Sequence, residues 1–389
     1  MPFDIIYTNI GRGHPFYLDG ILQALNHAGA IRLVRRQADV FELSHGLARL
    51  AWRTVRRLYH LGGAGGVGGK VYSALRGRNQ YRQDSFALRL LGRDVKRTYA
   101  DDRVPLLVAH PSLVGLLQSH GRVLYQHGEL VAPAEAAVPG AETVFVPTEE
   151  TAEVFHRAGY SVAQVLVTGL CVEPVLVRRA EDMFNHRMRR LQSEQPLTGA
   201  FFSSGAEPKK HLELILRAVA SVLNSGGRAI IFARKDGSLH RKVSRHLSRS
   251  LASGVVGDIH TPLPLDVPPL MLILFANRRE EDALTVQLFD RFDYYVGPSH
   301  ERTNWGVGLG LPMFITTPCI GPFAPLNLQL IANQGVGLAM DAQLATLFGR
   351  EIKSLKRQGT LADMARAGFG RYPIDGFKTI ADFLIEHFS

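Results

Sequence analysis

The stretch from Asp4 to Pro15 combines groups that could do chemistry on an anion. A short apolar run is followed by Gly11-Arg12-Gly13-His14, and Pro15 stands where the first residue of a helix is favoured. A helix N-terminus leaves backbone N–H groups free and carries partial positive charge, so it attracts an anion or a developing oxyanion. His14 could serve as a base near neutral pH. Phe16 replaces the third glycine of the dinucleotide fingerprint, so a plain turn with a surface histidine is the competing interpretation.

Polar residues also follow later apolar runs. The run at 122–125 ends at Gln126-His127-Gly128-Glu129, which makes His127 and Glu129 the rival base and its orienting partner, unless His127 is an ordinary strand-end histidine. Further runs at 105–109 and 143–146 alternate with helical patterns. This alternation predicts an α/β fold with a parallel sheet, and ligands bind such sheets at the carboxyl ends of the strands.

The same alternation restarts after a polar, basic segment. A predicted strand runs into Ser203-Ser204-Gly205, and a later one leads into a loop that begins at Ser299. Two α/β units of similar size imply two nucleotide-binding-type domains that face each other across a cleft. We predict an N-terminal domain over 1–172, a linker over 173–196, a C-terminal domain over 197–372, and a terminal helix over 373–389 that packs back on the N-terminal domain.

Composition limits the class of protein. The chain has 389 residues, of which 46% are hydrophobic and 21% charged, as expected for a soluble protein of two domains. No apolar run is long enough to span a bilayer and no secretory signal is visible, so we expect a cytoplasmic protein. Cys171 and Cys319 are too few for a disulfide framework and too isolated for a metal site.

The formal charge of +10 is concentrated in one region. Residues 1–100 hold 16 Lys and Arg against six Asp and Glu, which accounts for the whole excess. Such asymmetry indicates an anionic partner, and the basic segment 44–100 is the predicted contact. Around 44–59, apolar residues share one helical stripe and arginines lie on the other face, as in interfacial helices. A core-packed helix with a solvated basic face is the alternative. The predicted membrane-facing residues are Arg49, Trp52, Arg53, Arg56, Arg57 and Tyr59. Trp52 and Tyr59 lie on or beside the apolar stripe, which favours a membrane over nucleic acid.

The order of these motifs resembles the GT-B glycosyltransferases, specifically glycosyltransferase family 28, which includes peptidoglycan N-acetylglucosaminyltransferase and monogalactosyldiacylglycerol synthase. Gly11 to His14 is similar to the family's glycine-rich loop, and Tyr125 to Glu129 to its acceptor loop. The resemblance extends over nearly the whole chain, although each motif alone is loose. It implies a GT-B fold and transfer of a sugar from a nucleotide donor, expected to be a UDP-sugar, to a lipid hydroxyl.

In that reaction a base activates the acceptor hydroxyl, and positive potential stabilises the leaving diphosphate. We predict His14, His127 and Glu129 as catalytic residues. The resemblance implies a set of donor-binding and phosphate-binding residues: Gly11, Gly13, Ser203, Ser204, Gly205, Ser299, His300, Glu301, Arg302, Thr303 and Asn304. No Asp-x-Asp pair for a divalent cation is present, so we predict transfer without a metal or other cofactor. The protein is expected on the cytoplasmic face of a membrane as a peripheral protein that does not bind nucleic acid.

Two departures from the family bear on the donor. The family's ribose-binding glutamate is replaced by Asn304 or Trp305, and a sugar-contacting polar pair is replaced by Phe323 and Ala324. One alternative is a nucleotide-sugar 2-epimerase of the same fold, which needs several carboxylates where this loop offers only Glu301. The other is a catalytically silent GT-B scaffold that binds an anionic membrane or nucleic acid.

Overall fold

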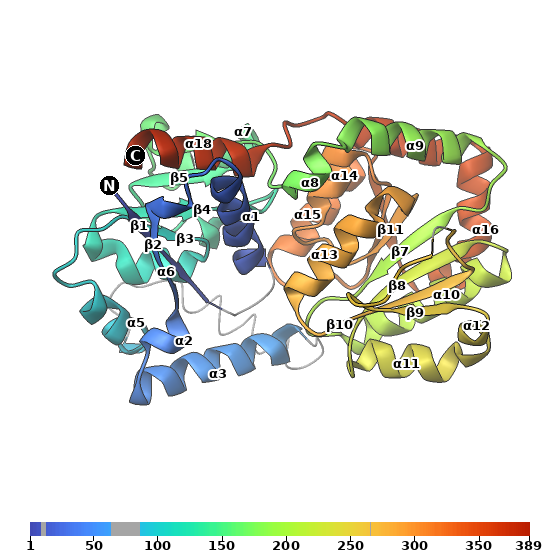
Figure 1. Cartoon of the computed structure of the whole chain (residues 1–389), viewed down its shortest axis with the longest axis horizontal. Helices are drawn as coiled ribbons and strands as arrows, with labels where there is room; N and C mark the ends of the chain where they lie inside the picture. The colour runs from blue at the N-terminus through green and yellow to red at the C-terminus, as the bar shows by residue number, and fades with distance from the viewer. Residues whose placement is uncertain (9–12, 64–85, 265) are drawn as a thin grey trace. The chain divides into compact units, whose positions relative to one another are not determined.

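The chain folds into two compact α/β units (Figure 1). The computed structural model describes residues 1–8, 13–63, 86–264 and 266–389. Unit 1 comprises Met1–Pro174 and Tyr372–Ser389, and unit 2 comprises Val175–Arg371. All strand pairs named below are parallel, as the alternation of strands and helices predicts.

Within the described residues, the sheet of unit 1 has six strands in the order β2-β1-β3-β4-β5-β6. The strands are β1 (Phe3–Tyr7), β2 (Val34–Asp39), β3 (Leu106–Val108), β4 (Val123–Gln126), β5 (Thr143–Val146) and β6 (Val165–Val167). The helices are α1 (Gly13–His27), α2 (Val40–Leu43), α3 (Gly46–Gly63), α5 (Phe86–Thr98), α6 (Pro111–Leu117), α7 (Glu149–Arg157) and α18 (Gly376–Phe388). The short helix α8 (Pro174–Val177) begins at Pro174 of unit 1 and continues into unit 2.

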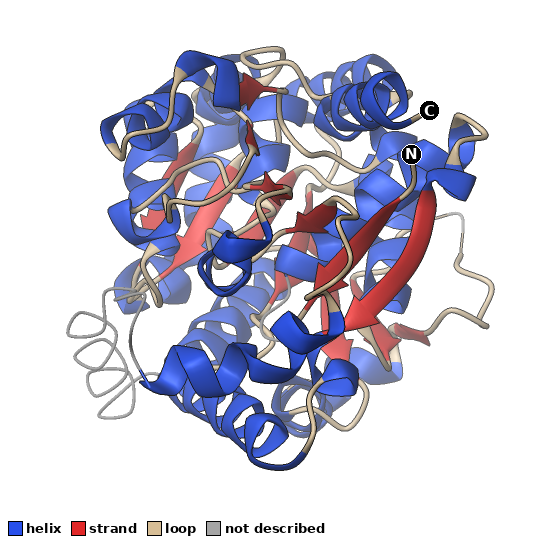
Figure 2. Ribbon diagram, turned by 90° about the vertical axis from the view of Figure 1, so that its left-hand side faces the viewer, coloured by secondary structure: helices blue, strands red, loops and turns tan. Residues whose placement is uncertain are grey.

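Successive strand residues point to opposite sides of this sheet, and helices bury both faces. Ile5, Leu107 and Phe145 belong to a core beneath α1 and α18. Their neighbours Ile6 and Val108 belong to a second core that includes side chains of α3, α5 and α6. Figure 2 shows the strands flanked by helices.

The C-terminal helix α18 packs on α1, as predicted for the terminal segment. The ring of Phe377 on α18 lies over Gly20 of α1, where an added Cβ would come within 2.2 Å of the ring. Phe16 contacts the same ring edge-on at 5.7 Å. The N-terminal amine of Met1 also donates to the carbonyl of Phe388, so the two termini lie together. Unit 1 is therefore completed by the last residues of the chain.

The described sheet of unit 2 has seven strands in the order β13-β12-β11-β7-β8-β10-β9. The strands are β7 (Thr198–Phe202), β8 (Arg228–Arg234), β9 (Val255–Gly257), β10 (Leu270–Phe275), β11 (Tyr294–Gly297), β12 (Met313–Thr316) and β13 (Gly337–Met340). The helices are α9 (Ala180–Gln192), α10 (Lys209–Asn224), α11 (Ser238–His246), α12 (Ser248–Ala252), α13 (Arg278–Leu288), α14 (Thr303–Leu309), α15 (Phe323–Asn333), α16 (Ala342–Arg357) and α17 (Thr360–Gly368).

Most of the segment predicted as a linker is an integral part of unit 2. Arg187 of α9 is fully buried and donates to the carbonyls of Phe292, Leu309 and Gly310. Arg190 forms an ion pair with the buried carboxylate of Asp293 at 2.7 Å. The linker prediction for 173–196 is therefore corrected. Its polar composition reflects cations that are buried and bonded, which makes α9 a support for the strand β11 and the end of α14.

The packing of α18 on α1 can be tested by stability. Phe377→Ala removes a buried ring and leaves a cavity above Gly20, so we expect unfolding of unit 1 to cost about 3 kcal/mol less. The measurement is urea unfolding followed by the fluorescence of Trp52, in a Trp305→Phe background so that the signal reports unit 1. Lys378→Ala, one residue along the same helix, removes an exposed side chain and should change the free energy by less than about 0.5 kcal/mol. Equal effects of the two substitutions would contradict this packing.

Candidate functional site

Three histidines meet at the carboxyl edge of the unit 1 sheet. His14 stands in the first turn of α1 after β1, His110 follows β3, and His127 follows β4, and these three strands are adjacent. The rings of His14 and His110 have their centroids 4.4 Å apart. His14 is also close enough to His127 for its charge to contribute to lowering the pKa of His127. This edge is where parallel α/β sheets bind ligands.

No role was predicted for His110, which directly follows the apolar run at 105–109. Its Nδ1 accepts the N–H of Ser112 at 3.0 Å and so caps the N-terminus of α6. Because Nδ1 accepts this hydrogen bond, the tautomer that fits carries its proton on Nε2. The signal that could have found it is the one used for His127, a histidine directly after an apolar run.

His127 is held in place by both ring nitrogens. Its Nε2 lies 3.2 Å from the carbonyl oxygen of Val131, and the hydroxyl of Tyr125 lies 3.3 Å from its Nδ1. Burial lowers the pKa of His127 to about 4. A neutral ring that donates to the carbonyl of its own loop fits a structural role better than that of a base. Of the predicted histidines, the half-buried His14 is better placed to accept a proton.

The loop after His127 is fixed by neighbouring elements. The ring of Tyr17 on α1 lies where a Cβ on Gly128 would come within 2.2 Å, so only glycine fits at this position. The hydroxyl of Thr151 at the start of α7 donates to the carbonyl of Leu130 at 2.8 Å. Glu129 is 9% exposed within this loop, two residues after His127, and follows β4 at the same edge of the sheet. Of the predicted glycine pair, Gly13 is the first residue of α1, and Gly11 lies outside the described residues.

In unit 2 the predicted phosphate loop follows β7. Ser203 has its hydroxyl oxygen buried without a hydrogen-bond partner among the described residues, and Ser204 and Gly205 are increasingly exposed. The next helix, α10, begins only at Lys209, after the residues 206–208. Lys209 and Lys210 are exposed in its first turn and are cations that the sequence analysis did not single out. An orphaned hydroxyl at the end of β7 and exposed lysines at the start of the next helix are groups that could bind phosphate oxygens.

The second predicted donor segment, from Ser299 to Asn304, is largely built into the protein interior. The hydroxyl of Ser299 donates to the carbonyl of Ala324 at 2.8 Å. Burial lowers the pKa of His300, which is half-buried. Glu301, Thr303 and Asn304 are each less than 9% exposed. His300 is thus the best exposed member of this group.

Arg302 does not occupy the position predicted for a phosphate ligand. Its guanidinium carbon lies 4.0 Å from the ring centroid of Phe202, and its Nη2 donates to Glu281 at 2.6 Å. The side chain is almost fully buried, and Trp305 packs beside it in the same aromatic cluster. The prediction for Arg302 is therefore corrected. It is a core cation, stabilised by a carboxylate and two aromatic rings.

The amphipathic helix α3 is present, but its faces differ from those predicted. Trp52 is 1% exposed, and its indole N–H donates to the carbonyl of Leu91 on α5 at 3.0 Å. Trp52 is therefore a core residue, and its assignment to a membrane surface is corrected. The exposed residues are two leucines, Leu47 at 66% and Leu50 at 56%, and four arginines: Arg49, Arg53, Arg56 and Arg57. Tyr59 lies on α3, but its side chain is outside the described part.

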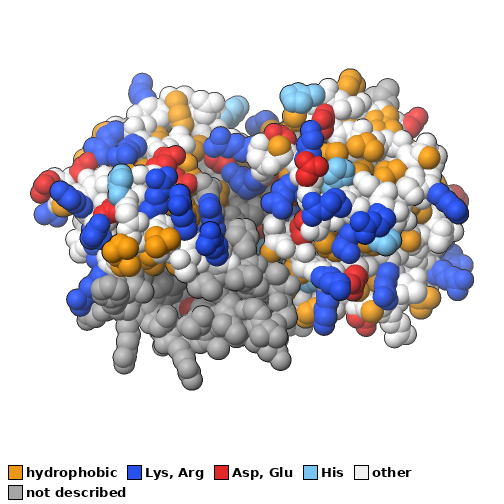
Figure 3. All heavy atoms as spheres, turned by 90° about the horizontal axis from the view of Figure 1, so that it is seen from below, with side chains coloured by type: hydrophobic (Ala, Val, Ile, Leu, Met, Phe, Trp, Pro, Cys, Tyr) orange, Lys and Arg blue, Asp and Glu red, His pale blue; other side chains and the backbone are white. Residues whose placement is uncertain are grey.

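These exposed residues form a basic surface, which we call the α3 surface. Among the described residues, α3 and the adjoining α5 carry eight Lys and Arg and one acidic residue, Asp94. Figure 3 shows Lys and Arg side chains and a small hydrophobic group over this face of unit 1. In the described ranges we find no helix long and apolar enough to cross a membrane. The combination of exposed leucines and arginines is typical of contact with lipid headgroups.

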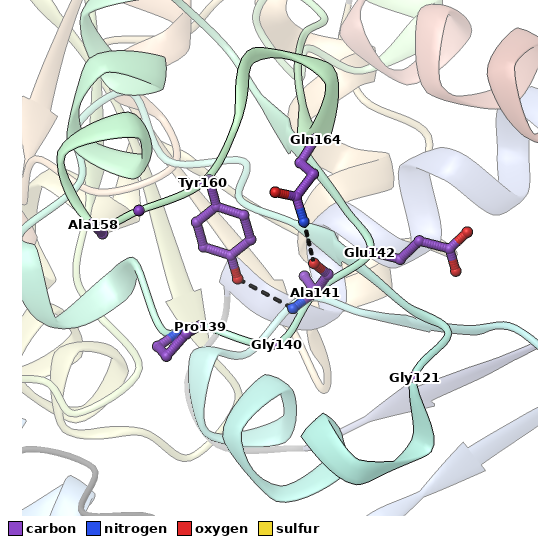
Figure 4. A pocket seen from close by; sticks show the side chains of 9 residues that line it. Gly121, Pro139, Gly140, Ala141, Glu142, Ala158, Tyr160 and Gln164 are labelled. Carbon is purple, nitrogen blue, oxygen red and sulfur yellow. Dashed lines mark hydrogen bonds between the residues drawn. The ribbon is translucent and has the colours of Figure 1, made fainter.

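A hollow of about 500 Å³ lies at the opposite, amino edge of the unit 1 sheet (Figure 4). It is lined by segments that precede β4, β5 and β6. The hydroxyl of Tyr160 donates to the carbonyl of Val138 and accepts the N–H of Ala141, and Gln164 donates to the carbonyl of Ala141. These polar groups bond to one another, so the hollow is a structural feature rather than part of the candidate site.

Neither a scan against protein-family models nor a search of curated proteins finds a match to this sequence. Solved structures do match. UDP-GlcNAc 2-epimerase from Neisseria meningitidis, bound to UDP-GlcNAc, is 12% identical with a TM-score of 0.57, covering 99% of this chain and 100% of that one. MurG from Acinetobacter baumannii is 12% identical with a TM-score of 0.56 and the same coverage. MnaA of S. aureus, in a co-structure with UDP, is 11% identical with a TM-score of 0.56, covering 99% and 95%.

The chain has the GT-B fold. At these identities the likeness shows the fold alone, so the assignment to family 28 stays a prediction. The described residues contain no group of three or more His, Cys, Asp or Glu side chains arranged to hold a metal ion. Activity without a metal ion also stays a prediction.

The buried His127 predicts a pH dependence of stability. Well above pH 6.5 the ring is neutral in both the folded and the unfolded chain. As the pH falls towards 4, the unfolded chain binds a proton that folded His127 does not, so the free energy of unfolding falls, by up to about 3 kcal/mol. We expect His127→Gln to lose this part of the decline between pH 7 and 4.5, measured by urea unfolding. His211 and His300, whose pKa values burial also lowers, supply a decline that remains in the variant. An unchanged pH profile in the variant would refute the assignment.

Proposed function

We propose that this GT-B protein is a glycosyltransferase that moves a sugar from a nucleotide-sugar donor to a hydroxyl group of a membrane lipid. The observation that carries the proposal is the α3 surface, where Leu47 and Leu50 are exposed among four arginines in the same unit as His14. Binding of a soluble acceptor does not require two exposed leucines on a basic helix. Binding to a lipid surface does, because the leucines can enter the apolar layer. The protein would act as a peripheral protein on the cytoplasmic face of the membrane.

The donor is proposed to be a UDP-sugar bound by unit 2. Structures of the same fold are described with UDP-GlcNAc or UDP, which supports this choice of nucleotide. The carboxyl edge of the unit 2 sheet offers the orphaned hydroxyl of Ser203, the lysines at the start of α10 and the half-buried His300. These groups would bind the diphosphate by charge-assisted hydrogen bonds and stabilise it as the leaving group.

The chemical step would use His14 as the base. The acceptor oxygen forms a bond to the anomeric carbon, the bond from that carbon to the diphosphate oxygen breaks, and UDP leaves with the electron pair. The proton of the acceptor hydroxyl passes to a ring nitrogen of His14. Because burial lowers the pKa of His127, the proton taken up by His14 meets no charged ring at that position.

A 2-epimerase is the second candidate. Its support is that a UDP-GlcNAc 2-epimerase matches this fold as well as MurG does, with TM-scores of 0.57 and 0.56. The α3 surface favours the transferase, because an enzyme that only rearranges a soluble nucleotide sugar has no use for it. The third candidate is a catalytically silent scaffold. It would be favoured if the protein bound no nucleotide sugar.

Transfer depends on His14 in this proposal. We expect wild-type protein, labelled UDP-sugars and extracted lipids to give a labelled lipid, and His14→Ala to lower the rate by at least about 100-fold, the usual contribution of a general base. His27→Ala, at the other end of the same helix and exposed, is the matched control and should retain the wild-type rate. Turnover of a UDP-sugar to its 2-epimer without labelled lipid would favour the epimerase. If no UDP-sugar bound or reacted, the catalytically silent scaffold would be the remaining candidate.

The α3 surface gives a separate prediction. The double substitution Leu47→Gln and Leu50→Gln should weaken binding to vesicles of phosphatidylcholine and phosphatidylglycerol by about tenfold, because each leucine loses the free energy of entering the interface. Both side chains are exposed, so the fold should be unaffected. The control is Ile31→Gln with Val162→Gln, two exposed apolar residues elsewhere in unit 1. If the control pair weakens binding as much as the α3 pair, this surface has no special role.

A further inference from the structure

A second basic surface lies on unit 2, around α11. Between Arg234 and Arg249 the chain carries six Lys and Arg and a single acidic residue, Asp236. The six cations are Arg234, Lys235, Arg241, Lys242, Arg245 and Arg249, and all are exposed except Lys242, which is half-buried. The net basic excess of the whole chain falls in residues 1–100, because acidic residues elsewhere in the chain cancel this cluster in the overall count.

Three of these cations, Arg241, Lys242 and Arg245, lie on the helix α11. Leu239 and Val243 are fully buried against the sheet, where α11 packs on β8. Arg241 and Arg245 are exposed one helical turn apart, and Arg249 follows at the same spacing on α12. In Figure 3 Lys and Arg side chains gather over the face of unit 2 that carries α11. We call these cations the α11 surface.

Within the described part of the chain, these cations are not paired with carboxylates. No carboxylate in the described ranges forms an ion pair with any of the six, and Arg241 donates only to the backbone carbonyl of Asp236. The nearby carboxylate of Glu207 is engaged elsewhere, because it accepts the N–H groups of Ser238 and Leu239 at the start of α11. Six cations of one sign on a folded unit repel one another, which an anionic partner relieves.

The surroundings of the α11 surface fit lipid better than nucleic acid. Val256, on the edge strand β9 that follows α12, is 50% exposed, and Ile259 in the next loop is 40% exposed. Residues 234–260 contain no Phe, Trp or Tyr, so no aromatic ring is available to stack on an unpaired base. Arginines beside exposed aliphatic side chains match anionic headgroups above an apolar layer.

We propose that the α11 surface is a second membrane contact, through which unit 2 binds anionic lipid headgroups independently of the α3 surface on unit 1. The inference rests on the membrane part of the proposed function and not on sugar transfer. Its consequence is that the unit proposed to bind the donor is itself attracted to the membrane surface by its own charges. That attraction is electrostatic, so it weakens as salt is added.

The test uses the full chain and vesicles of phosphatidylcholine with phosphatidylglycerol, with pure phosphatidylcholine as reference, in a flotation assay at low and high salt. The variant Arg241→Gln, Lys242→Gln, Arg245→Gln should bind anionic vesicles at least about tenfold more weakly, since each cation near the surface contributes about a factor of five. The matched control is Arg350→Gln, Lys353→Gln, Arg357→Gln on α16, which removes the same charge from exposed positions of the same unit and should bind as the wild type.

The outcomes separate the two membrane contacts. Weaker binding by the α11 variant, with the control unchanged and the difference lost at high salt, supports the inference. Wild-type binding by the α11 variant, while Leu47→Gln with Leu50→Gln still weakens binding, overturns the inference and leaves the proposed function intact. Equal losses in the α11 and α16 variants would mean that only net charge matters and would also overturn it. The inference would also be overturned if single-stranded RNA bound the wild type but not the α11 variant while vesicle binding was the same for both.

Discussion

The structure of unit 1 depends on covering both faces of a parallel sheet. Residues of β1, β3 and β5 point alternately into two cores, and α1 alone cannot cover the face that holds Ile5 and Phe145. The C-terminal helix α18 supplies the missing cover, with Phe377 seated on Gly20 of α1. Because α1 carries His14 in its first turn, the helix that completes the core also fixes the position of the proposed base.

The same constraint explains why several polar residues near the proposed site are structural. In unit 2 the covering helices bring arginines into the interior, where Arg187 bonds to three carbonyls and Arg302 stacks on Phe202 and pairs with Glu281. In unit 1 His127 bonds to the carbonyl of Val131. Such groups hold loops near the strand ends. The half-buried His14 in one unit and the exposed Lys209 in the other remain available to a ligand.

The sequence alone predicted the fold well, because strand–helix alternation and the terminal amphipathic segment reflect local patterns. It failed where an outcome depended on tertiary partners. Trp52 has an interfacial pattern on the helix, but only the structure shows that Leu91 accepts its N–H. Arg302 lies in a loop that resembles a donor site, and its burial depends on Phe202, far away in sequence. The place of His110 in the candidate site was missed because it depends on contact with His14, which lies on the helix after a different strand. Predictions for Gly11 lie outside the described residues.

In the proposed function, sugar leaves the nucleotide only when a lipid acceptor at a membrane surface receives it. The most direct measurement is release of UDP from a UDP-sugar, followed together with label in the lipid phase, with and without acceptor-bearing anionic vesicles. We expect UDP release in a one-to-one ratio with labelled lipid, and little UDP release when vesicles are absent. UDP release or formation of an epimer at the same rate without any lipid would contradict the proposed function.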